Sequence, residues 1–373
     1  MKTFHCTHCD NPVFFENTRC LQCGQRLAFL PDFLEMRAFE SDVQTGLNAS
    51  TGSSQRKIYR LCDNAKFGAC NWAIPDEDTQ SYCVSCRRNV LIPDLAVPRN
   101  IELWQKIEYA KRRLFYTLLS LQLPLDGNPP LRFQFPVQVD GAPPVQIGHA
   151  NGLITINVAE ADDATRESQR VSLHEPFRTL LGHFRHEAGH YYWERLIKDS
   201  PKLDSFRQAF GDERLDYGNA LQKHYRDGPP SNWLEQSVSA YASAHPWEDW
   251  AETWAHYLHM LDTIETASSF GLSLNYWHPE AKPKSTDSLH YVKPGDDFGE
   301  TLNVWTSLTH VLNSFNRGMG IIDLYPFTLS SGSIKKLRFV HDIISEYFSC
   351  PKDVPTVSVE FPVGNSQQLR AVV

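Results

Sequence analysis

Apolar side chains recur at helical spacing through residues 101–123, which predicts a long amphipathic helix there. Pro124 follows this stretch and should end the helix. Two short strands are predicted next, over residues 131–135 and 152–159, with a loop rich in proline and glycine between them. Within the second strand, residues 153–158 alternate apolar and polar positions, as a half-buried strand does.

The chain after residue 190 is predicted to be almost wholly helical. Its periodic segments lie near residues 203–225, 231–243, 247–266, 299–316 and 332–348. Polar, glycine- and serine-rich residues over 42–56 predict a loop or linker, and the short apolar run 357–361 in the polar tail could pair as an edge strand. These patterns together predict an α+β fold that is mainly helical with a small sheet.

Composition narrows the classes of protein that fit. A chain of 373 residues is long enough for two or three domains with a large core. The formal net charge is −8, so no global field attracts nucleic acid or anionic lipid. No stretch approaches the roughly 20 apolar residues that a membrane helix needs. We therefore expect a soluble, cytoplasmic protein that does not bind membranes.

Eight of the nine cysteines lie in the first quarter of the chain as four pairs, which favours thiolate zinc sites over disulfides. Residues 1–40 are predicted to form a zinc ribbon, because two CxxC knuckles supply four sulfur ligands. Gly24 follows the second knuckle, where a positive φ lets the chain turn away. The predicted ligands of this first structural zinc are Cys6, Cys9, Cys20 and Cys23.

Residues 57–96 are predicted to form a second cysteine module with its own structural zinc. Cys62 and Cys70 are spaced more widely than a standard knuckle, whereas Cys83 and Cys86 form an ordinary one. A redox-active CxxC or simple packing cysteines are the alternatives here. The ninth cysteine, Cys350, reads as an ordinary thiol.

The run His186-Glu187-Ala188-Gly189-His190 is an HExxH motif in a predicted helix. Its two histidines lie one helical turn apart and can reach one metal ion, while Glu187 points beside that ion toward bound water. A chance match on an ordinary helix is the alternative. The predicted strand over 152–159 lies about thirty residues upstream, where zinc peptidases place an edge strand beside the metal, although it could equally be a plain sheet strand.

A third ligand is expected from a later helix. Glu248 and Glu252 lie one turn apart, so one carboxylate can bind zinc while the other accepts the free N–H of a ligating histidine. Three tryptophans surround these carboxylates with apolar bulk, which favours a functional pair over a solvated acidic face. Zinc held by three protein residues keeps a fourth position for water.

HExxH followed on a later helix by ExxxE resembles the gluzincin metallopeptidases. The cysteine ribbons together with the motifs GHANGLITIN, HFRHEAGHYYW, FGDE, GPP and HPWEDWAETWAH are similar to the bacterial family of putative zinc-binding metallopeptidases with an N-terminal zinc ribbon, over nearly the whole chain. This resemblance implies a gluzincin-like metallopeptidase domain over residues 97–373, preceded by the two zinc-ribbon-like modules.

The resemblance also implies a role for each site residue. His186, His190 and Glu248 would hold the catalytic zinc, and Glu252 would orient a ligating histidine. Glu187 would be the general base and then the acid. Tyr241 would donate a hydrogen bond to the oxyanion, although a tyrosine before a helix is often only packed. Four further histidines near the motifs read as packed or hydrogen-bonded residues, with His245 the one that could assist as a donor: His183, His245, His256 and His259.

The function predicted from these residues is hydrolysis of peptide or isopeptide bonds by Glu-assisted attack of zinc-bound water, with one catalytic and two structural zinc ions. The substrate would be a peptide or protein, and the ribbons could dock a protein partner. The competing hypothesis is a non-catalytic, zinc-stabilised adaptor that binds protein or nucleic acid through its ribbons. Retention of Glu187 favours the enzyme, because a structural site needs no water-activating carboxylate.

Overall fold

The computed structural model describes most of the chain. Outside the described residues lie 40–46, 50–56, 140, 142, 173–178, 275–291, 293, 324, 326–328 and 350–373. The strand predicted over residues 357–361 is among them. The predicted linker over 42–56 is only partly described, and its described part is a strand, β5 (Leu47–Ala49).

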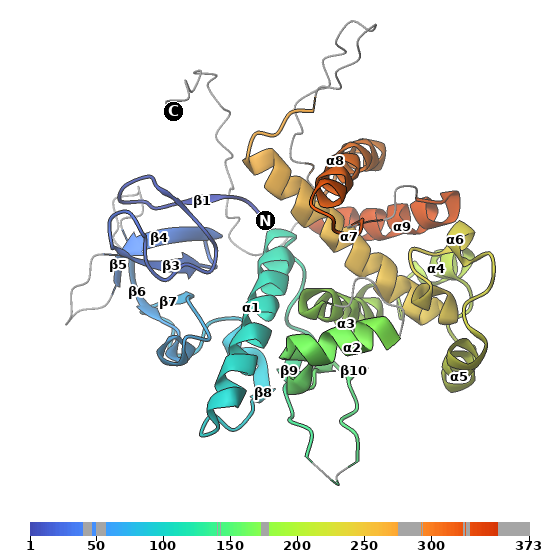
Figure 1. Cartoon of the computed structure of the whole chain (residues 1–373), viewed down its shortest axis with the longest axis horizontal. Helices are drawn as coiled ribbons and strands as arrows, with labels where there is room; N and C mark the ends of the chain where they lie inside the picture. The colour runs from blue at the N-terminus through green and yellow to red at the C-terminus, as the bar shows by residue number, and fades with distance from the viewer. Residues whose placement is uncertain are drawn as a thin grey trace, which may run out of the picture.

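The N-terminal region consists of short antiparallel strands (Figure 1). Strand β1 (Phe4–His5) pairs with β2 (Pro12–Val13), and β3 (Arg26–Leu30) forms a hairpin with β4 (Glu35–Phe39). In β3 the four residues from Leu27 onward are all buried, so this hairpin supplies the apolar centre of the region.

The second cysteine module follows as a three-stranded antiparallel sheet in the order β5-β6-β7, with β6 at Lys57–Leu61 and β7 at Ala73–Pro75. Two 3₁₀ turns, η1 (Asp63–Phe67) and η2 (Cys86–Arg88), carry the chain around its cysteines. A β-bridge between Phe29 and Trp72 joins this module to the β3–β4 hairpin.

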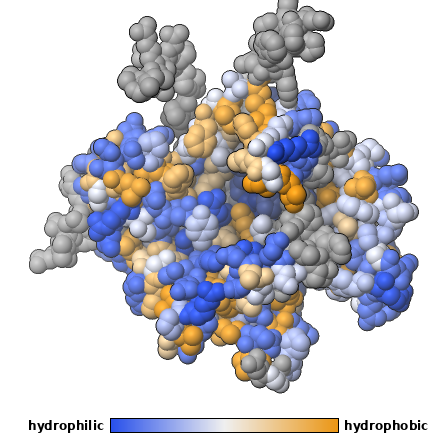
Figure 2. Space-filling model, viewed as in Figure 1, coloured by the Kyte–Doolittle hydropathy of each residue, from blue (hydrophilic) through white to orange (hydrophobic). Residues whose placement is uncertain are grey.

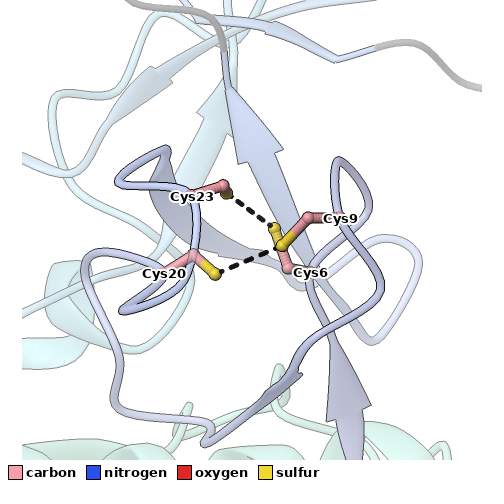
Figure 3. Close-up of side chains that lie close together, drawn as sticks. All are labelled: Cys6, Cys9, Cys20 and Cys23. Atoms are coloured by element: carbon pink, nitrogen blue, oxygen red, sulfur yellow. Dashed lines mark hydrogen bonds between the residues drawn. The ribbon is translucent and has the colours of Figure 1, made fainter.

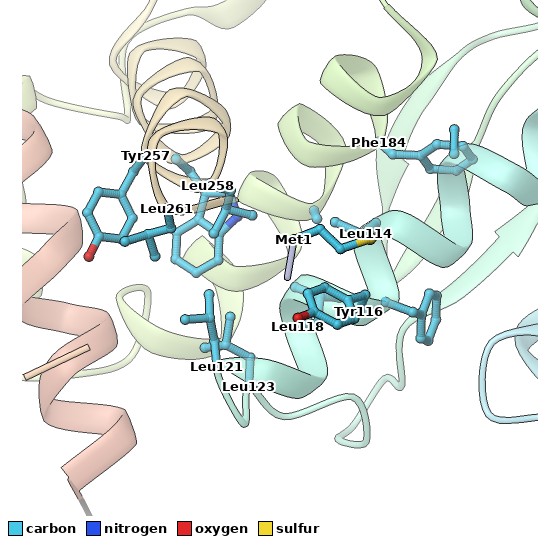
Figure 4. Packing of buried hydrophobic residues seen from close by; sticks show 14 of the residues in the cluster. Met1, Leu114, Tyr116, Leu118, Leu121, Leu123, Phe184, Tyr257, Leu258 and Leu261 are labelled. Atoms are coloured by element: carbon cyan, nitrogen blue, oxygen red, sulfur yellow. The ribbon is translucent and has the colours of Figure 1, made fainter. Parts of the chain in front are cut away.

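Helix α1 (Pro98–Ser120) begins at a proline, whose fixed φ suits the first turn of a helix. It lies between the N-terminal modules and the remaining helices in Figure 1. Toward the modules, Tyr116 packs with its ring 5.8 Å from that of Phe15. Toward the helices, Leu114 and Leu118 belong to the same buried cluster as Phe184 of α3 and Leu258 of α7 (Figure 4). One continuous core of buried residues therefore runs from the cysteine modules into the helical region.

A mixed sheet has the strand order β10-β11-β9-β8. Its strands are β8 (Asn89–Leu91), β9 (Arg132–Gln134), β10 (Gly148–Ala150) and β11 (Leu153–Thr155). The sequence left open whether the strand over 152–159 is an edge strand or a plain sheet strand; β11 lies in the interior of the sheet, and β10 is the edge strand beside it. The two are joined by Asn151-Gly152, both with positive φ, the usual chemistry of a tight hairpin.

Strand β8 belongs to this sheet although it lies inside the predicted second module, since it pairs in parallel with β9. The predicted domain boundaries at residues 40, 57 and 96 stay predictions.

After the sheet come η3 (Val158–Ala161), α2 (Asp163–Ser172), α3 (Leu180–Leu196), α4 (Leu203–Phe210), α5 (Tyr217–Asp227), α6 (Trp233–Gln236), η4 (Tyr241–Ala244), α7 (Pro246–Ser269), α8 (Phe298–Gly318) and α9 (Ser331–Ser349).

Two of the predicted helices are interrupted. The segment 203–225 divides into α4 and α5 at Gly211, whose φ of 103° favours glycine. The segment 231–243 divides into α6 and η4, and the residues between them reach the site described below. The remaining structure fits the predicted α+β class, mainly helical with small sheets.

The face of the molecule in Figure 2 mixes polar and apolar residues over both the N-terminal modules and the helices. Among the described residues, no helix has both the length and the apolar character that crossing a membrane requires.

Candidate metal centre

The centre lies where α3 crosses α7, and a glycine makes the crossing close. A Cβ atom on Gly189 would lie 2.9 Å from the Cα of Ala251 and 3.2 Å from the Cβ of Trp254. The two backbones can approach this closely only because Gly189 has no side chain. The indole of Trp250 also donates a hydrogen bond of 2.8 Å to the carbonyl oxygen of Gly189. The glycine inside HExxH thus brings the helix with the histidines against the helix with the glutamates.

Three predicted ligands meet at this crossing. One ligand atom from each of His186, His190 and Glu248 lies within 4.8 Å of the others, and all three residues are buried. The Nε2 atoms of the two histidines are 3.2 Å apart, and Oε2 of Glu248 is 3.0 Å from Nε2 of His186. Two ligands at 2.0–2.1 Å from a tetrahedral zinc would be about 3.3 Å apart. The donor atoms are therefore spaced as zinc requires.

The charges in this cluster also call for a cation. Burial acts against charge on His186, yet Glu248 and Glu252 raise the pKa of its imidazole well above the usual range. Burial likewise acts against the Glu248 carboxylate, yet His190 and His186 lower its pKa well below the usual range. The buried carboxylates thus favour positive charge at the imidazoles, and a divalent ion held by the three residues would supply that charge in place of the proton.

Glu252 takes the position expected of an orienting carboxylate. Its Oε1 lies 2.7 Å from Nδ1 of His186, so the ring nitrogen that faces away from the cluster can donate to it. The hydroxyl of Ser239 donates to Oε2 of Glu252 at 2.6 Å. Ser239 comes from the break between α6 and η4, which the sequence predicted to be one helix, so its contact with Glu252 was not foreseen.

A second unforeseen residue is Tyr217, at the start of α5. Its hydroxyl donates a 2.7 Å hydrogen bond to Oε1 of Glu248. Oε2 of Glu248, the atom nearest His186, has no hydrogen-bond donor among the described residues. Tyr217 thus engages Oε1 of the glutamate, which also lies 3.5 Å from Nε2 of His190, and leaves Oε2 to face His186. Nothing in the local sequence around Tyr217 marks it, because it lies thirty-one residues from Glu248 in the chain.

Glu187 lies beside the cluster. Its Oε1 is 3.1 Å from Nε2 of His183, whereas its Oε2 is buried with no hydrogen-bond partner in the described part of the chain. A Cβ atom on Gly148 would lie 3.9 Å from that Oε2, so the edge strand β10 runs past the carboxylate. An unpaired buried carboxylate oxygen is costly, and such atoms are commonly found where a reacting water or substrate is meant to bind.

Tyr241, in η4, lies near the histidines. Its ring centre is 6.0 Å from that of His186, and burial raises the pKa of its hydroxyl, which therefore stays protonated near neutral pH. The structure thus brings Tyr241 near the ligands, but its predicted role as oxyanion donor stays a prediction.

His245 is no candidate donor for the reaction. Its Nδ1 accepts the backbone N–H of Trp247 as the N-cap of α7, and its Nε2 lies 3.1 Å from the carbonyl oxygen of Leu215. Both ring nitrogens are therefore engaged. The contact at Nδ1 caps the helix that carries Glu248. His256 and His259 contact Tyr325 and Arg185, respectively, in line with the predicted structural role.

The first cysteine cluster has the geometry of a zinc knuckle pair (Figure 3). Its Sγ atoms lie 3.7 Å apart for Cys6 and Cys23, and 3.6 Å apart for Cys9 and Cys20. Thiolates at 2.3 Å from a tetrahedral zinc would be about 3.8 Å apart. The predicted positive φ at Gly24 is 74°, and Asp10 takes the matching place in the other knuckle with a φ of 60°.

The second cluster brings together all four of its predicted cysteines despite their irregular spacing. Its Cys70 and Cys83 sulfurs are 3.8 Å apart, and all four cysteines are buried. Turn η1 takes up the additional residues between Cys62 and Cys70. Backbone N–H groups of Trp72 and Cys83 point at cluster sulfurs at 3.4 Å, which stabilises thiolates. This arrangement fits a thiolate metal site.

Comparison with known proteins agrees with this class of fold and site. The chain belongs to the family of putative zinc-binding metallo-peptidases, which it matches over residues 100–343, and a zinc-ribbon domain matches residues 3–97. Zinc is accordingly the metal that both the family and the three ligand clusters indicate.

Its relatives include uncharacterized proteins of Mycobacterium bovis and Mycobacterium tuberculosis. Each is 38% identical over 353 residues, which cover 93% of this chain and 96% of the relative. No solved structure matches the chain.

Proposed function

We propose that this protein is a zinc-dependent hydrolase that cleaves peptide or isopeptide bonds at the α3–α7 crossing. The observation that carries the proposal is the position of Glu187. It follows His186 in α3, its carboxylate interacts electrostatically with His186 and His190, and its Oε2 is buried with no hydrogen-bond partner among the described residues. A purely structural metal site has no use for such a group, because its cost is offset only if it acts on something that binds there.

The chemistry divides between the metal and the residues around it. A zinc ion on this triad would polarise the substrate carbonyl and lower the pKa of a water to about 7. Glu187 would take the proton of the attacking water at Oε2 and return it to the departing amine. Glu252 would keep the His186 ring in the tautomer that presents Nε2 to the metal.

We assign the oxyanion donor to Tyr241 rather than Tyr217. The Tyr217 hydroxyl already donates its hydrogen bond to Glu248. Tyr241, in contrast, lies near His186 with a hydroxyl that stays protonated. A donor of this kind stabilises the charge that develops on the carbonyl oxygen.

The substrate would bind as an extended peptide along β10. Among the described strands β10 pairs only with β11, so its other edge offers backbone groups for a further strand. Gly148 lies on β10 next to Glu187, which would bring the peptide backbone to the base. The proposal includes three zinc ions per chain, one at this site and one in each cysteine cluster.

The N-terminal modules would serve as structure first and as a docking surface second. Their cores are continuous with α1, and the first module exposes two large apolar side chains, Phe14 at 74% and Leu21 at 93%. Such side chains suit a protein partner. The acidic net charge weighs against nucleic acid. Thiolate clusters of this kind fit the reducing cytoplasm, where we place the protein.

Substrate trapping tests the proposal. Glu187→Gln should keep the fold and the zinc content, because Glu187 is not a ligand, and it should stop turnover while substrate still binds. Proteins that co-purify with the variant but not with wild type would be identified by mass spectrometry. They would then be incubated with wild-type and variant enzyme.

Cleavage by wild type alone supports the hydrolase. Equal cleavage by Glu187→Gln, or stable binding to wild type without cleavage, would overturn it in favour of the adaptor. Glu265→Gln is the matched control, since Glu265 is also buried but lies far along α7 beside Tyr116.

A further inference from the structure

His183 lies one helical turn before Glu187 on α3, with its ring between two carboxylates. Its Nε2 is 3.1 Å from Oε1 of Glu187, and its Nδ1 is 2.7 Å from Oε2 of Glu160. The three side chains are largely closed to solvent, with exposed fractions of 12% for His183, 4% for Glu160 and 7% for Glu187. From the sequence, only packing or a hydrogen bond was expected of this histidine.

An ionised carboxylate only accepts hydrogen bonds. Both ring nitrogens of His183 must therefore carry a proton if both contacts are hydrogen bonds, which makes the ring an imidazolium. Two buried carboxylates on either side of it provide the charge that such a cation needs. Burial alone lowers the pKa of His183, but Glu160 and Glu187 raise it to about 10, in agreement with the geometry.

We propose that His183, held in place by Glu160, is a positioning residue that binds Oε1 of Glu187 and so leaves Oε2 as the oxygen that meets the reacting water. The terminal torsion of a glutamate is broad, and a free carboxylate would present either oxygen in many orientations. The hydrogen bond from His183 removes this freedom. Misplacement of a reacting group by about 1 Å can cost on the order of 10²-fold in rate.

The origin of Glu160 gives the arrangement a second consequence. Glu160 lies in η3, which follows β11 after two residues, and β11 pairs with the edge strand β10. The chain Glu160–His183–Glu187 therefore ties the base to the sheet along which the substrate would bind. The position of the base is therefore coupled to the position of the substrate strand, and the two do not shift separately.

This inference rests on the proposed hydrolase, and its test separates the two. The first measurement needs no substrate. In zinc-loaded protein labelled with ¹⁵N-histidine, His183 should give two ring N–H resonances near neutral pH, identified by their loss in His183→Gln. Glu160→Gln removes the charge but keeps an amide acceptor, so it should weaken or abolish the Nδ1–H signal. A single ring proton on His183 in the wild type would overturn the inference.

The second measurement uses the substrate that trapping recovers. His183→Gln should lower kcat by roughly 10²-fold with KM and zinc content unchanged. Glu160→Gln should lower kcat in the same direction but less, and the double variant should be no worse than His183→Gln. His341→Gln is the matched control, because His341 is also a buried, hydrogen-bonded histidine but lies in α9 against Tyr257.

The outcomes are distinct. If Glu187→Gln cleaves as well as wild type, the proposed hydrolase fails. If Glu187→Gln is inactive while His183→Gln keeps the wild-type kcat, the hydrolase stands and the role of His183 is refuted. Loss of zinc from His183→Gln in parallel with activity would also refute it, since a positioning residue of the base should leave the metal in place. Should His183→Gln fail to fold, Glu160→Gln carries the same comparison.

Discussion

The contact between Glu252 and His186 yields a quantitative prediction about metal affinity. Glu252→Gln would replace a charged acceptor 2.7 Å from Nδ1 by a neutral amide, which can present either its oxygen or its NH₂ group. A hydrogen bond to a charged group contributes about 1.5–3 kcal/mol. Since about 1.4 kcal/mol is a factor of ten, zinc affinity at the His186 site should fall by roughly 10- to 100-fold.

Two companion variants calibrate this effect. Glu248→Gln should weaken zinc binding by more than about 100-fold, because it removes the charge of a ligand rather than of a residue behind one. Ser239→Ala should have the smallest effect, since the Ser239 hydroxyl acts only on Oε2 of Glu252 at 2.6 Å. Glu265→Gln, the same substitution farther along α7, should leave affinity unchanged.

The assay must separate one zinc site from two others. A mild chelator should remove zinc from the His/Glu site first, while the buried thiolate clusters keep theirs, and elemental analysis would verify the remainder. Zinc would then be returned in competition with a chromophoric chelator. If Glu252→Gln strips the site while Glu248→Gln retains it, the two glutamates have the opposite roles from those assigned. Equal affinities for wild type and both variants would refute the site.

Three further predictions concern other parts of the molecule. Replacing Cys6 and Cys9 with serine should remove one zinc of three by elemental analysis and leave the His/Glu zinc, whereas loss of all metal would mean that the sites are not independent. Gly189→Ala should cost about 1–3 kcal/mol in denaturant unfolding and weaken zinc binding, since the new methyl would meet the Cα of Ala251 at 2.9 Å; unchanged stability would refute the tight crossing. The pKa of His183 is raised to about 10, so its stabilisation should be complete below about pH 6.5 and lost as the pH rises toward 10. Thermal unfolding over this range should show a steeper alkaline loss in wild type than in His183→Gln, and parallel curves would contradict the imidazolium.

The parts of this site that the sequence predicted are those that depend on local spacing. HExxH fixes two histidines on one helical face, and two glutamates one turn apart on α7 do the same. A zinc site formed by four cysteines in two CxxC pairs can also be predicted with little tertiary information. The irregular pair Cys62 and Cys70 was assigned to a zinc site from its partner knuckle, and the structure brings all four of those cysteines together.

The contacts that were missed come from places where the chain departs from a periodic pattern. Ser239 and Tyr217 contact the glutamates from positions where helices are interrupted or begin. The apolar periodicity had predicted continuous helices through both positions. Residues 152–159 were predicted to form a strand because they alternate in the β manner, but this pattern could not decide between an edge strand and an interior one. The true edge, β10, is a three-residue strand that begins with glycine and carries no such pattern. Its position follows from strand pairing, which local sequence does not encode.

The continuous core between the cysteine modules and α1 has a consequence for the order of assembly. The modules precede α1 in the chain, and their aromatic side chains form part of the surface on which Tyr116 packs. Small cysteine modules of this kind close only when metal binds, because metal-binding free energy is then folding free energy. We therefore expect folding of α1 and the helices that follow it to depend on zinc supply. A cell short of zinc would accumulate an incompletely folded chain rather than a folded enzyme that lacks only its catalytic ion.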